Sequence, residues 1–239
     1  MRNAKTDVIL KVFNYSSLFN NEIEVLITQA DSYWDSNYPE SRVSKIRKSF
    51  NLKNNLIITP HQIHSDKVVS VSKDTDPCLA CDGIIYNLDS DIVGTINVAD
   101  CIPICIFDAS NKNIALIHSG WRGTHKKIVL NAINQLIELG SDFKKIKIFL
   151  GPSIKGCCYE VDQDFSSKFD PYAVRNYNGK YFVDLANQVK FDLESISIPS
   201  NNIFVDQICT YDSLECHSYR RDGDNAGRMT LIVYRRSLK

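Results

Sequence analysis

Three residues that lie far apart along the chain carry the side chains that zinc prefers. They are His64, Cys101 and His118, and the last of them opens a short run of His, Ser, Gly, Trp, Arg and Gly. One thiolate and two imidazoles form a zinc ligand set that leaves a fourth coordination position open. Trp121 and Arg122 add an aromatic wall and a fixed cation beside this candidate metal site. Such a dense run of functional residues favours an enzyme.

The cysteine and the second histidine are placed by a predicted β-hairpin. Residues 102–107 and 114–118 predict its two strands, with a polar turn between them. A turn centred between residues 109 and 110 would pair Cys101 with His118, with Cβ atoms about 4.5–5.5 Å apart. The hairpin is otherwise apolar on both faces, so this polar pair needs a partner, which a metal supplies. A buried thiol beside a hydrogen-bonded histidine is the structural alternative.

Strands dominate the middle of the chain, with helices between the later strands, and no repeat or linker interrupts them. Further strands are predicted over 8–13, 23–28, 56–59, 67–71, 84–86, 92–98, 146–150, 203–208 and 230–234. Helices are predicted over 42–50, 126–139, 161–170 and 183–194, with a loop over 31–42. This pattern predicts a mixed α/β protein of the α+β type, folded as a single domain over residues 1–239.

The composition excludes several classes of protein. The chain has 239 residues, 44% of them hydrophobic, and its 28 basic side chains equal its 28 acidic ones. A net charge of zero argues against a general nucleic-acid or membrane-surface role. No apolar run reaches the roughly 20 residues of a membrane span, and no signal peptide is recognisable. The eight cysteines are therefore expected in the reducing cytoplasm, as thiols or metal ligands.

Several further motifs accompany the three candidate ligands in a fixed order. The motifs are Gln62-Ile63-His64, Cys81-Asp82-Gly83, Ala99-Asp100-Cys101-Ile102-Pro103, the run 118–123, Gly151-Pro152-Ser153-Ile154 with Cys157-Cys158-Tyr159-Glu160-Val161, and Ser218-Tyr219-Arg220-Arg221-Asp222 with Gly227-Arg228-Met229. In these motifs the chain resembles the YfiH/laccase-domain family, which is also called a purine nucleoside phosphorylase family. The resemblance covers about residues 55–235.

The resemblance implies a fold, a metal and a pair of reactions. It implies a sandwich of mixed β-sheets with helices packed outside, and a zinc ion held by His64, Cys101 and His118. The implied reactions are phosphorolysis of adenosine, inosine, guanosine and 5′-methylthioadenosine, and hydrolytic deamination of adenosine. A purine nucleoside and phosphate are then the partners. The chain departs from the family pattern at Ser65, at Cys81 and in the stretch 28–32, which concerns the substrate pocket more than the metal ligands.

Other residues in these motifs are predicted to serve the reaction. Arg122 is suited to hold phosphate through two hydrogen bonds, and Arg47 is a candidate second cation. Asp82 is predicted either to orient a zinc-bound histidine or to accept a proton. Cys158 and Glu160 are predicted to approach the site from the segment after Gly151-Pro152.

Each of several residues in these motifs also has a purely structural alternative. Arg122 would instead form an ion pair with Asp100 or Asp82. Tyr159 is expected in the core rather than against a base. The arginines at 220, 221 and 228 flank acidic residues and are expected to form a structural salt-bridge loop.

Three other functions remain open from the sequence. In a metal-free thiol hydrolase Cys101 would be the nucleophile and His118 its base. A copper polyphenol oxidase needs a blue copper centre and a trinuclear cluster, and five histidines cannot supply both. The third function is a non-enzymatic binding or scaffold protein with a structural zinc. Such a zinc normally has four protein ligands, whereas His64, Cys101 and His118 are only three. The pair Cys78 and Cys81 has zinc-knuckle spacing but would have to borrow Cys157 and Cys158, adjacent residues with poor geometry for the purpose.

Overall fold

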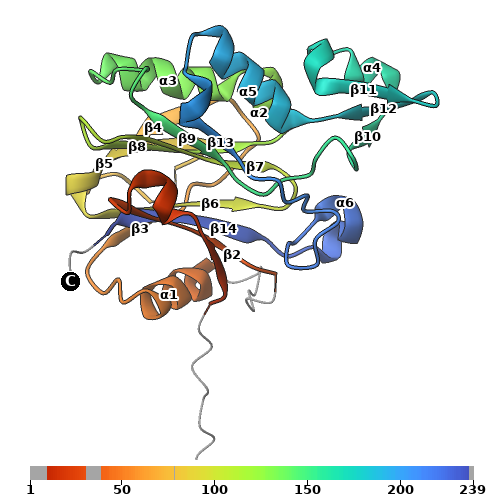
Figure 1. Cartoon of the computed structure of the whole chain (residues 1–239). Coiled ribbons are helices and arrows are strands. Elements are labelled where there is room, and N and C mark those ends of the chain that lie inside the picture. Colours follow the sequence, from red (N-terminus) through yellow and green to blue (C-terminus); the bar gives the residue numbers. More distant parts are fainter. Residues whose placement is uncertain (1–9, 31–38, 78, 237–239) are drawn as a thin grey trace, which may run out of the picture.

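Two large β-sheets face each other in the computed structural model, which describes residues 10–30, 39–77 and 79–236 (Figure 1). The first sheet has the order β1 (Val12–Asn14), β2 (Ile23–Thr28), β14 (Met229–Arg235), β6 (Ile92–Val98) and β3 (Leu56–Ile58). The second has the order β13 (Ile203–Val205), β9 (Lys147–Leu150), β7 (Ile102–Asp108), β8 (Asn113–Ser119), β5 (Gly83–Asn87) and β4 (Val68–Ser70). Both contain parallel and antiparallel pairs, so the predicted mixed sandwich is confirmed.

Helices cover the outer faces of this sandwich. On the six-stranded sheet lie α2 (Trp121–His125), α3 (Ile128–Glu138) and α5 (Leu185–Ser195), whereas α1 (Pro39–Ser49) covers the five-stranded sheet (Figure 1). A third, small sheet of β10 (Glu160–Val161), β12 (Lys180–Val183) and β11 (Val174–Tyr177) projects at one edge together with α4 (Gln163–Ser166). No helix in the described ranges is long and apolar enough to cross a membrane.

The central hairpin is buried on both faces because it is enclosed by a sheet on one side and helices on the other. Every residue of β7 and β8 is buried, which explains their continuous apolar character. One face, with Ile104 and Ile117, packs in the core under α3 and α5. The other, with Cys105 and Leu116, packs against the five-stranded sheet.

The register of this hairpin differs from the predicted one. Pro103 pairs with His118, so the predicted pairing of Cys101 with His118 is wrong. The turn is centred one residue later because Asp108 Oδ1 accepts the N–H groups of Ser110 and Asn111. A one-residue shift of the centre moves each partner by two positions, which preserves the face on which a side chain lies.

Several predicted elements change their bounds. The helix expected over 126–139 is observed as α3 and begins at Ile128, because Lys127, which has a left-handed backbone (φ 58°), separates it from α2. The helix expected over 161–170 shrinks to α4, and the hairpin of β11 and β12 was missed because its strands are short and largely exposed. The helix expected over 42–50 begins earlier, at Pro39. Most of the loop expected over 31–42 lies outside the described residues.

The contact between the two sheets is tight at Gly94 of β6. A Cβ added there would lie 2.6 Å from Tyr86 Cε1 and 2.7 Å from Leu116 Cδ1, and both side chains are buried. We therefore expect Gly94→Ala to lower the free energy of unfolding by about 1–3 kcal/mol, the usual cost of overpacking a core. Denaturant unfolding measures this change. Ser70→Ala, at an exposed strand position, is the control, and equal stability of the two variants would contradict the expectation.

Candidate metal centre

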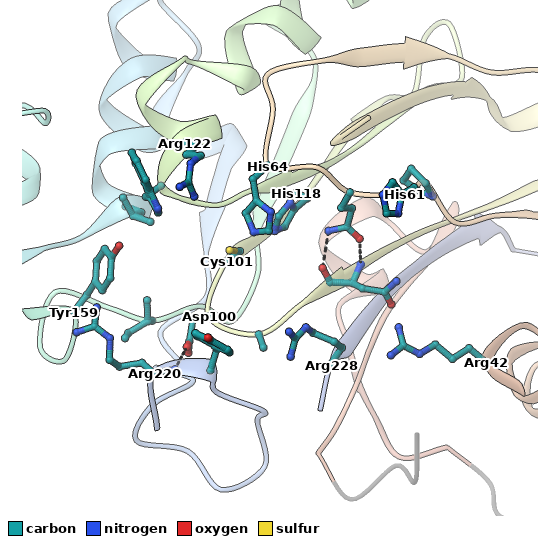
Figure 2. Close-up of a pocket in the computed structure, with 18 residues that line it drawn as sticks. Arg42, His61, His64, Asp100, Cys101, His118, Arg122, Tyr159, Arg220 and Arg228 are labelled. Atoms are coloured by element: carbon teal, nitrogen blue, oxygen red, sulfur yellow. Dashed lines mark hydrogen bonds between the residues drawn. The ribbon is translucent and has the colours of Figure 1, made fainter. Parts of the chain in front are cut away.

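His64, Cys101 and His118 meet at one end of the sandwich. Their ligand atoms all lie within 4.8 Å of one another, and the two imidazole rings are nearly perpendicular with centroids 4.8 Å apart. All three side chains line a cavity of about 720 Å³ (Figure 2). His118 belongs to β8, Cys101 immediately precedes β7, and His64 lies in the loop between β3 and β4.

The carboxylate of Asp82, which is completely buried, positions both histidines. Its Oδ1 lies 2.8 Å from His118 Nδ1 and accepts the backbone N–H of His64 at 3.0 Å. Its Oδ2 accepts the N–H and the hydroxyl of Ser65 at 2.6 and 2.7 Å. Because Nδ1 of His118 is engaged by Asp82, Nε2 is the nitrogen left for a metal. Ser65, a departure from the family pattern, thus adds a hydrogen bond to this carboxylate.

The loop that carries His64 is also fixed to the five-stranded sheet. The side-chain amide of Gln62 donates to the carbonyl of Asn97 at 2.7 Å and accepts its N–H at 2.8 Å (Figure 2). His64 has a left-handed backbone (φ 57°), as does Asp100 (φ 76°) beside Cys101. Such conformations persist only where surrounding contacts impose them, and they cluster at functional sites.

Charges at the site reinforce one another. Burial alone would raise the pKa of Asp82, but hydrogen bonds from His118 and Ser65 outweigh it and hold the pKa at about 2. Burial lowers the pKa of His118, yet its contacts with Asp82 and Cys101 raise it to about 9. Burial raises the pKa of Cys101, and the two histidines lower it to about 6. The two histidines therefore favour the thiolate of Cys101, the form in which cysteine binds a metal or acts as a nucleophile.

The donor set fits a metal ion. Ligand atoms of a tetrahedral zinc ion, at roughly 2.0–2.3 Å from it, lie about 3.3–3.8 Å apart. The three ligand atoms here lie within 4.8 Å of one another, so small side-chain movements would let one ion contact all three. The histidine–carboxylate contact of His118 with Asp82 is the support that metal-ligating histidines usually have. His64, Cys101 and His118 could thus hold a zinc ion with three protein ligands.

Trp121 and Arg122 both line the same cavity. The guanidinium of Arg122 lies 4.3 Å from the ring centroid of Trp121, a cation–π contact. Neither Asp82 nor Asp100 pairs with Arg122 in the described chain, because Asp82 binds the histidine loop and Asp100 accepts from Thr210 Oγ1 and the N–H of Arg220. The donors of Arg122 therefore remain available to a bound anion.

Three other predicted residues lie elsewhere. Arg47 in α1 donates to the carbonyls of Leu52 and Lys53, in the segment after the helix, at 2.9 and 3.2 Å. Glu160 forms an exposed ion pair with Lys180 at 3.0 Å. Cys158 turns its sulfur to Asp212 Oδ2 at 3.3 Å. None of the three is among the described residues that line the cavity around His64.

Four side chains that were not assigned to the site from the sequence line the cavity. Arg42, Tyr159, Arg220 and Arg228 line it (Figure 2), and the guanidinium of Arg220 lies 4.9 Å from the ring centroid of Tyr159. Tyr159 is thus a wall residue rather than a core residue. Its burial raises the pKa of the phenol to about 12, so it stays neutral. Arg42 was not predicted from the sequence, since it belongs to no recognisable motif. It reaches the cavity because of the way α1 packs on the five-stranded sheet.

Comparison with known proteins agrees with this arrangement. The model of the family described as multi-copper polyphenol oxidoreductase laccase matches residues 36–236. A purine nucleoside phosphorylase of Aquifex aeolicus is 36% identical over 177 residues, which are 74% of this chain and 82% of that protein. A purine nucleoside phosphorylase of Clostridium acetobutylicum is 33% identical over 187 residues, covering 73% of this chain and 75% of that protein.

Solved structures share the fold. The hypothetical protein YfiH of Bacillus licheniformis superposes with a TM-score of 0.83 at 20% identity, over 97% of this chain and 98% of that chain. YlmD of Geobacillus stearothermophilus gives a TM-score of 0.80 at 21% identity, over 90% of this chain and 93% of that chain. The family match spans most of the sequence, and the chain belongs to the laccase-like YfiH family.

Proposed function

We propose that this chain is a zinc-dependent purine nucleoside phosphorylase. One observation carries the proposal: three metal-binding side chains, His64, Cys101 and His118, converge in a cavity of about 720 Å³ that also holds arginine and aromatic side chains. The relatives named purine nucleoside phosphorylase support the same reading. The proposed substrates are adenosine, inosine, guanosine and 5′-methylthioadenosine with phosphate, and hydrolytic deamination of adenosine is the proposed second reaction.

The two histidines and the cysteine would hold the zinc ion, and Asp82 would keep His118 in the ligating tautomer. When bound with three protein ligands, zinc supplies a Lewis acid with one open coordination position. Copper is the less suitable metal, because the chain has five histidines and a multicopper oxidase needs many more imidazole ligands than this site provides.

The cavity wall offers separate places for an anion and a base. Arg122 is the proposed phosphate-binding residue, since its fork of N–H donors suits two phosphate oxygens and the carboxylates of Asp82 and Asp100 are bound to other groups. Trp121 and Tyr159 offer aromatic surface for a purine. Arg42, Arg220 and Arg228 add positive charge that attracts phosphate to the cavity. Positioning both reactants side by side is itself a large contribution to catalysis.

A thiol hydrolase is the second candidate, favoured by one specific observation. The pKa of Cys101 is lowered to about 6, after burial has been outweighed by its contacts with His118 and His64. A thiolate beside an imidazole could attack an acyl or amidine carbon without a metal. Metal bound to Cys101 would block this chemistry, so the two candidates respond oppositely when the metal is removed.

The first experiment is a product assay. Purified protein of known metal content is incubated with adenosine, with and without phosphate, and the products are separated by chromatography. We expect phosphate-dependent adenine and phosphate-independent inosine, both lost in Cys101→Ala and after chelation because the metal is lost. Cys105→Ala removes a buried thiol of β7 and is the matched control. Full turnover in Cys101→Ala would overturn both candidate functions, whereas turnover that survives chelation but not Cys101→Ala would favour the thiol hydrolase.

Gly120 provides a more selective test of the metal site. Its backbone (φ −78°, ψ 179°) suits any residue, but an added Cβ would lie 2.8 Å from Cys101 Sγ and 3.4 Å from His64 Cδ2. Gly120→Ala should therefore displace the thiolate and weaken metal binding by about 10–100-fold, the range seen when ligand orientation is disturbed. Metal titration measures this loss.

A double variant supplies the control for Gly120. In Cys101→Ala the sulfur that meets the new methyl group is absent, so adding Gly120→Ala should lower little further the weak affinity that His64 and His118 retain for an ion, measured at high metal concentration. Equal, additive losses in the two backgrounds would contradict the proposed clash.

Arg122 tests the phosphate site. We expect Arg122→Gln to raise the KM for phosphate by about 10–150-fold, which corresponds to the roughly 1.5–3 kcal/mol of a charged hydrogen bond. Phosphate-independent formation of inosine should change much less. Arg47→Gln removes a guanidinium that lies outside the cavity and serves as the control. If Arg47→Gln raised the KM for phosphate more than Arg122→Gln, the phosphate-binding residue would be Arg47 and not Arg122.

A further inference from the structure

A second cluster of metal-binding side chains lies outside the cavity of His64. Cys157 and Cys158 follow β9, Cys209 follows β13, and Asp212 lies three residues further along. Their ligand atoms all lie within 4.8 Å of one another. Cys158 Sγ is 3.1 Å from Cys157 Sγ and 3.3 Å from Asp212 Oδ2, and Cys157 Sγ is 3.7 Å from the same oxygen. The adjacent cysteines thus point to the same side, contrary to the poor geometry expected from the sequence.

Two pairings of distant segments build this cluster. The parallel pair of β9 and β13 continues beyond the strands as a bridge between Ser153 and Cys209, where Thr210 donates its N–H to the carbonyl of Ser153 at 3.2 Å. This pairing brings the turn with Cys157 and Cys158 beside the segment after β13. The convergence is therefore a consequence of the sheet and not of a local motif.

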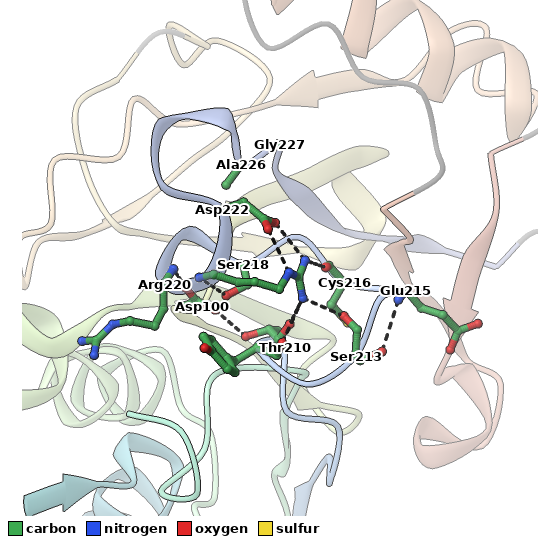
Figure 3. Close-up of polar contacts among 12 residues, drawn as sticks. Asp100, Thr210, Ser213, Glu215, Cys216, Ser218, Arg220, Asp222, Ala226 and Gly227 are labelled. Carbon is green, nitrogen blue, oxygen red and sulfur yellow. Dashed lines mark hydrogen bonds and ion pairs between the residues drawn. The ribbon is translucent and has the colours of Figure 1, made fainter. Parts of the chain in front are cut away.

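Arg221 holds the loop that carries Cys209 and Asp212. Figure 3 labels Thr210, Ser213 and Cys216, three of the loop residues that it contacts. The guanidinium of Arg221 donates to four carbonyls of this loop and pairs with Asp222 at 2.9 Å. The four acceptors are the carbonyl oxygens of Thr210, Tyr211, Ser213 and Cys216, at 2.8–3.1 Å. A ligand loop that is ordered in advance loses little conformational entropy when it binds an ion.

We propose that Cys157, Cys158, Cys209 and Asp212 bind a second divalent cation of the thiophilic kind, such as zinc. In a tetrahedral zinc site, two sulfur ligands lie about 3.8 Å apart and a sulfur and an oxygen ligand about 3.6 Å apart. The two sulfur–oxygen separations of 3.3 and 3.7 Å are close to this value, the two adjacent sulfurs are closer at 3.1 Å, and Cys209 Sγ lies within 4.8 Å of the other ligand atoms. Sulfur ligands select zinc over magnesium or calcium. Four protein ligands fill the coordination sphere, which is the pattern of a structural rather than a catalytic ion.

The surroundings of the cluster suit such an ion. Cys157 is exposed and Cys158 is partly exposed, so an ion can enter from solvent. Three thiolates and a carboxylate leave an excess of negative charge around a dication. The ammonium of Lys155, which lines the neighbouring cavity with Cys157 and Cys209 and interacts electrostatically with both, offsets part of it.

The second site has a direct connection to the first. Thr210, the residue after Cys209, donates its hydroxyl to Asp100 Oδ1 at 2.6 Å, and Asp100 precedes Cys101. An ion at the second site would therefore stabilise the loop that helps to impose the left-handed backbone of Asp100. The proposal does not depend on the reaction that the first site performs.

Metal counting on the reduced full-length protein tests the proposal. The protein is stripped with a chelator, equilibrated with zinc under a thiol reductant that does not bind metal, and analysed for bound zinc. We expect about two zinc ions per chain in the wild type and about one in Cys209→Ser or in Cys101→Ala, because each site supplies its own ligands. Asp212→Asn, at an exposed position, is a second variant that keeps all three thiols and should weaken only the second ion.

Cobalt separates the two sites by their spectra. The near-ultraviolet sulfur-to-cobalt band should be stronger for three thiolates than for one, so most of it should vanish in Cys209→Ser and persist in Cys101→Ala. Cys105→Ala, which removes a cysteine outside both clusters, should leave metal content and spectrum unchanged. About one zinc ion in the wild type that is retained in Cys209→Ser, or a disulfide of Cys209 that persists in the reduced, zinc-equilibrated protein, would overturn the proposal.

Discussion

The buried carboxylate of Asp82 is the constraint around which the candidate metal centre is arranged. A charge without any exposed surface is tolerable only when it is fully hydrogen-bonded, and Asp82 meets this demand with the imidazole of His118, the N–H of His64 and both donors of Ser65. Those contacts join the start of β5, the end of β8 and the loop after β3. Removing any one partner would leave a buried charge partly unsatisfied, so the three segments stay in one arrangement.

The double sheet makes this arrangement rigid. The strands β7 and β8 are buried along their whole length, so the residues at their ends cannot move without disturbing a close-packed interior. The functional side chains of the first site stand at these ends or in the adjoining loops, where the backbone can adopt unusual conformations such as those of His64 and Asp100. A stiff scaffold with irregular ends is a common way to combine stability with a precise site.

Sequence patterns predicted the local parts of this structure better than the long-range ones. The hairpin of β7 and β8 was predicted from its apolar runs, and its register error of two positions kept Cys101 on the side of His118, because side chains alternate with a period of two. The cavity position of Arg42 and the location of Cys158 were not predictable in this way. Both depend on which distant segments pack together, α1 on the first sheet and β13 beside β9, and no spacing along the chain encodes that.

The two cysteine-containing clusters differ in the number of ligands that they offer to a metal ion. Cys101 stands with two imidazoles and a supporting carboxylate at a cavity wall, so a metal held there keeps a coordination position facing the cavity. The cluster of Cys157, Cys158 and Cys209 adds Asp212 as a fourth donor and faces a separate cavity, so an ion there has no free position for a substrate. The hydrogen bond from Thr210 to Asp100 joins the two clusters, so ordering of the loop after Cys209 and ordering of the backbone beside Cys101 would stabilise each other, while Cys101 keeps its place in the cavity wall.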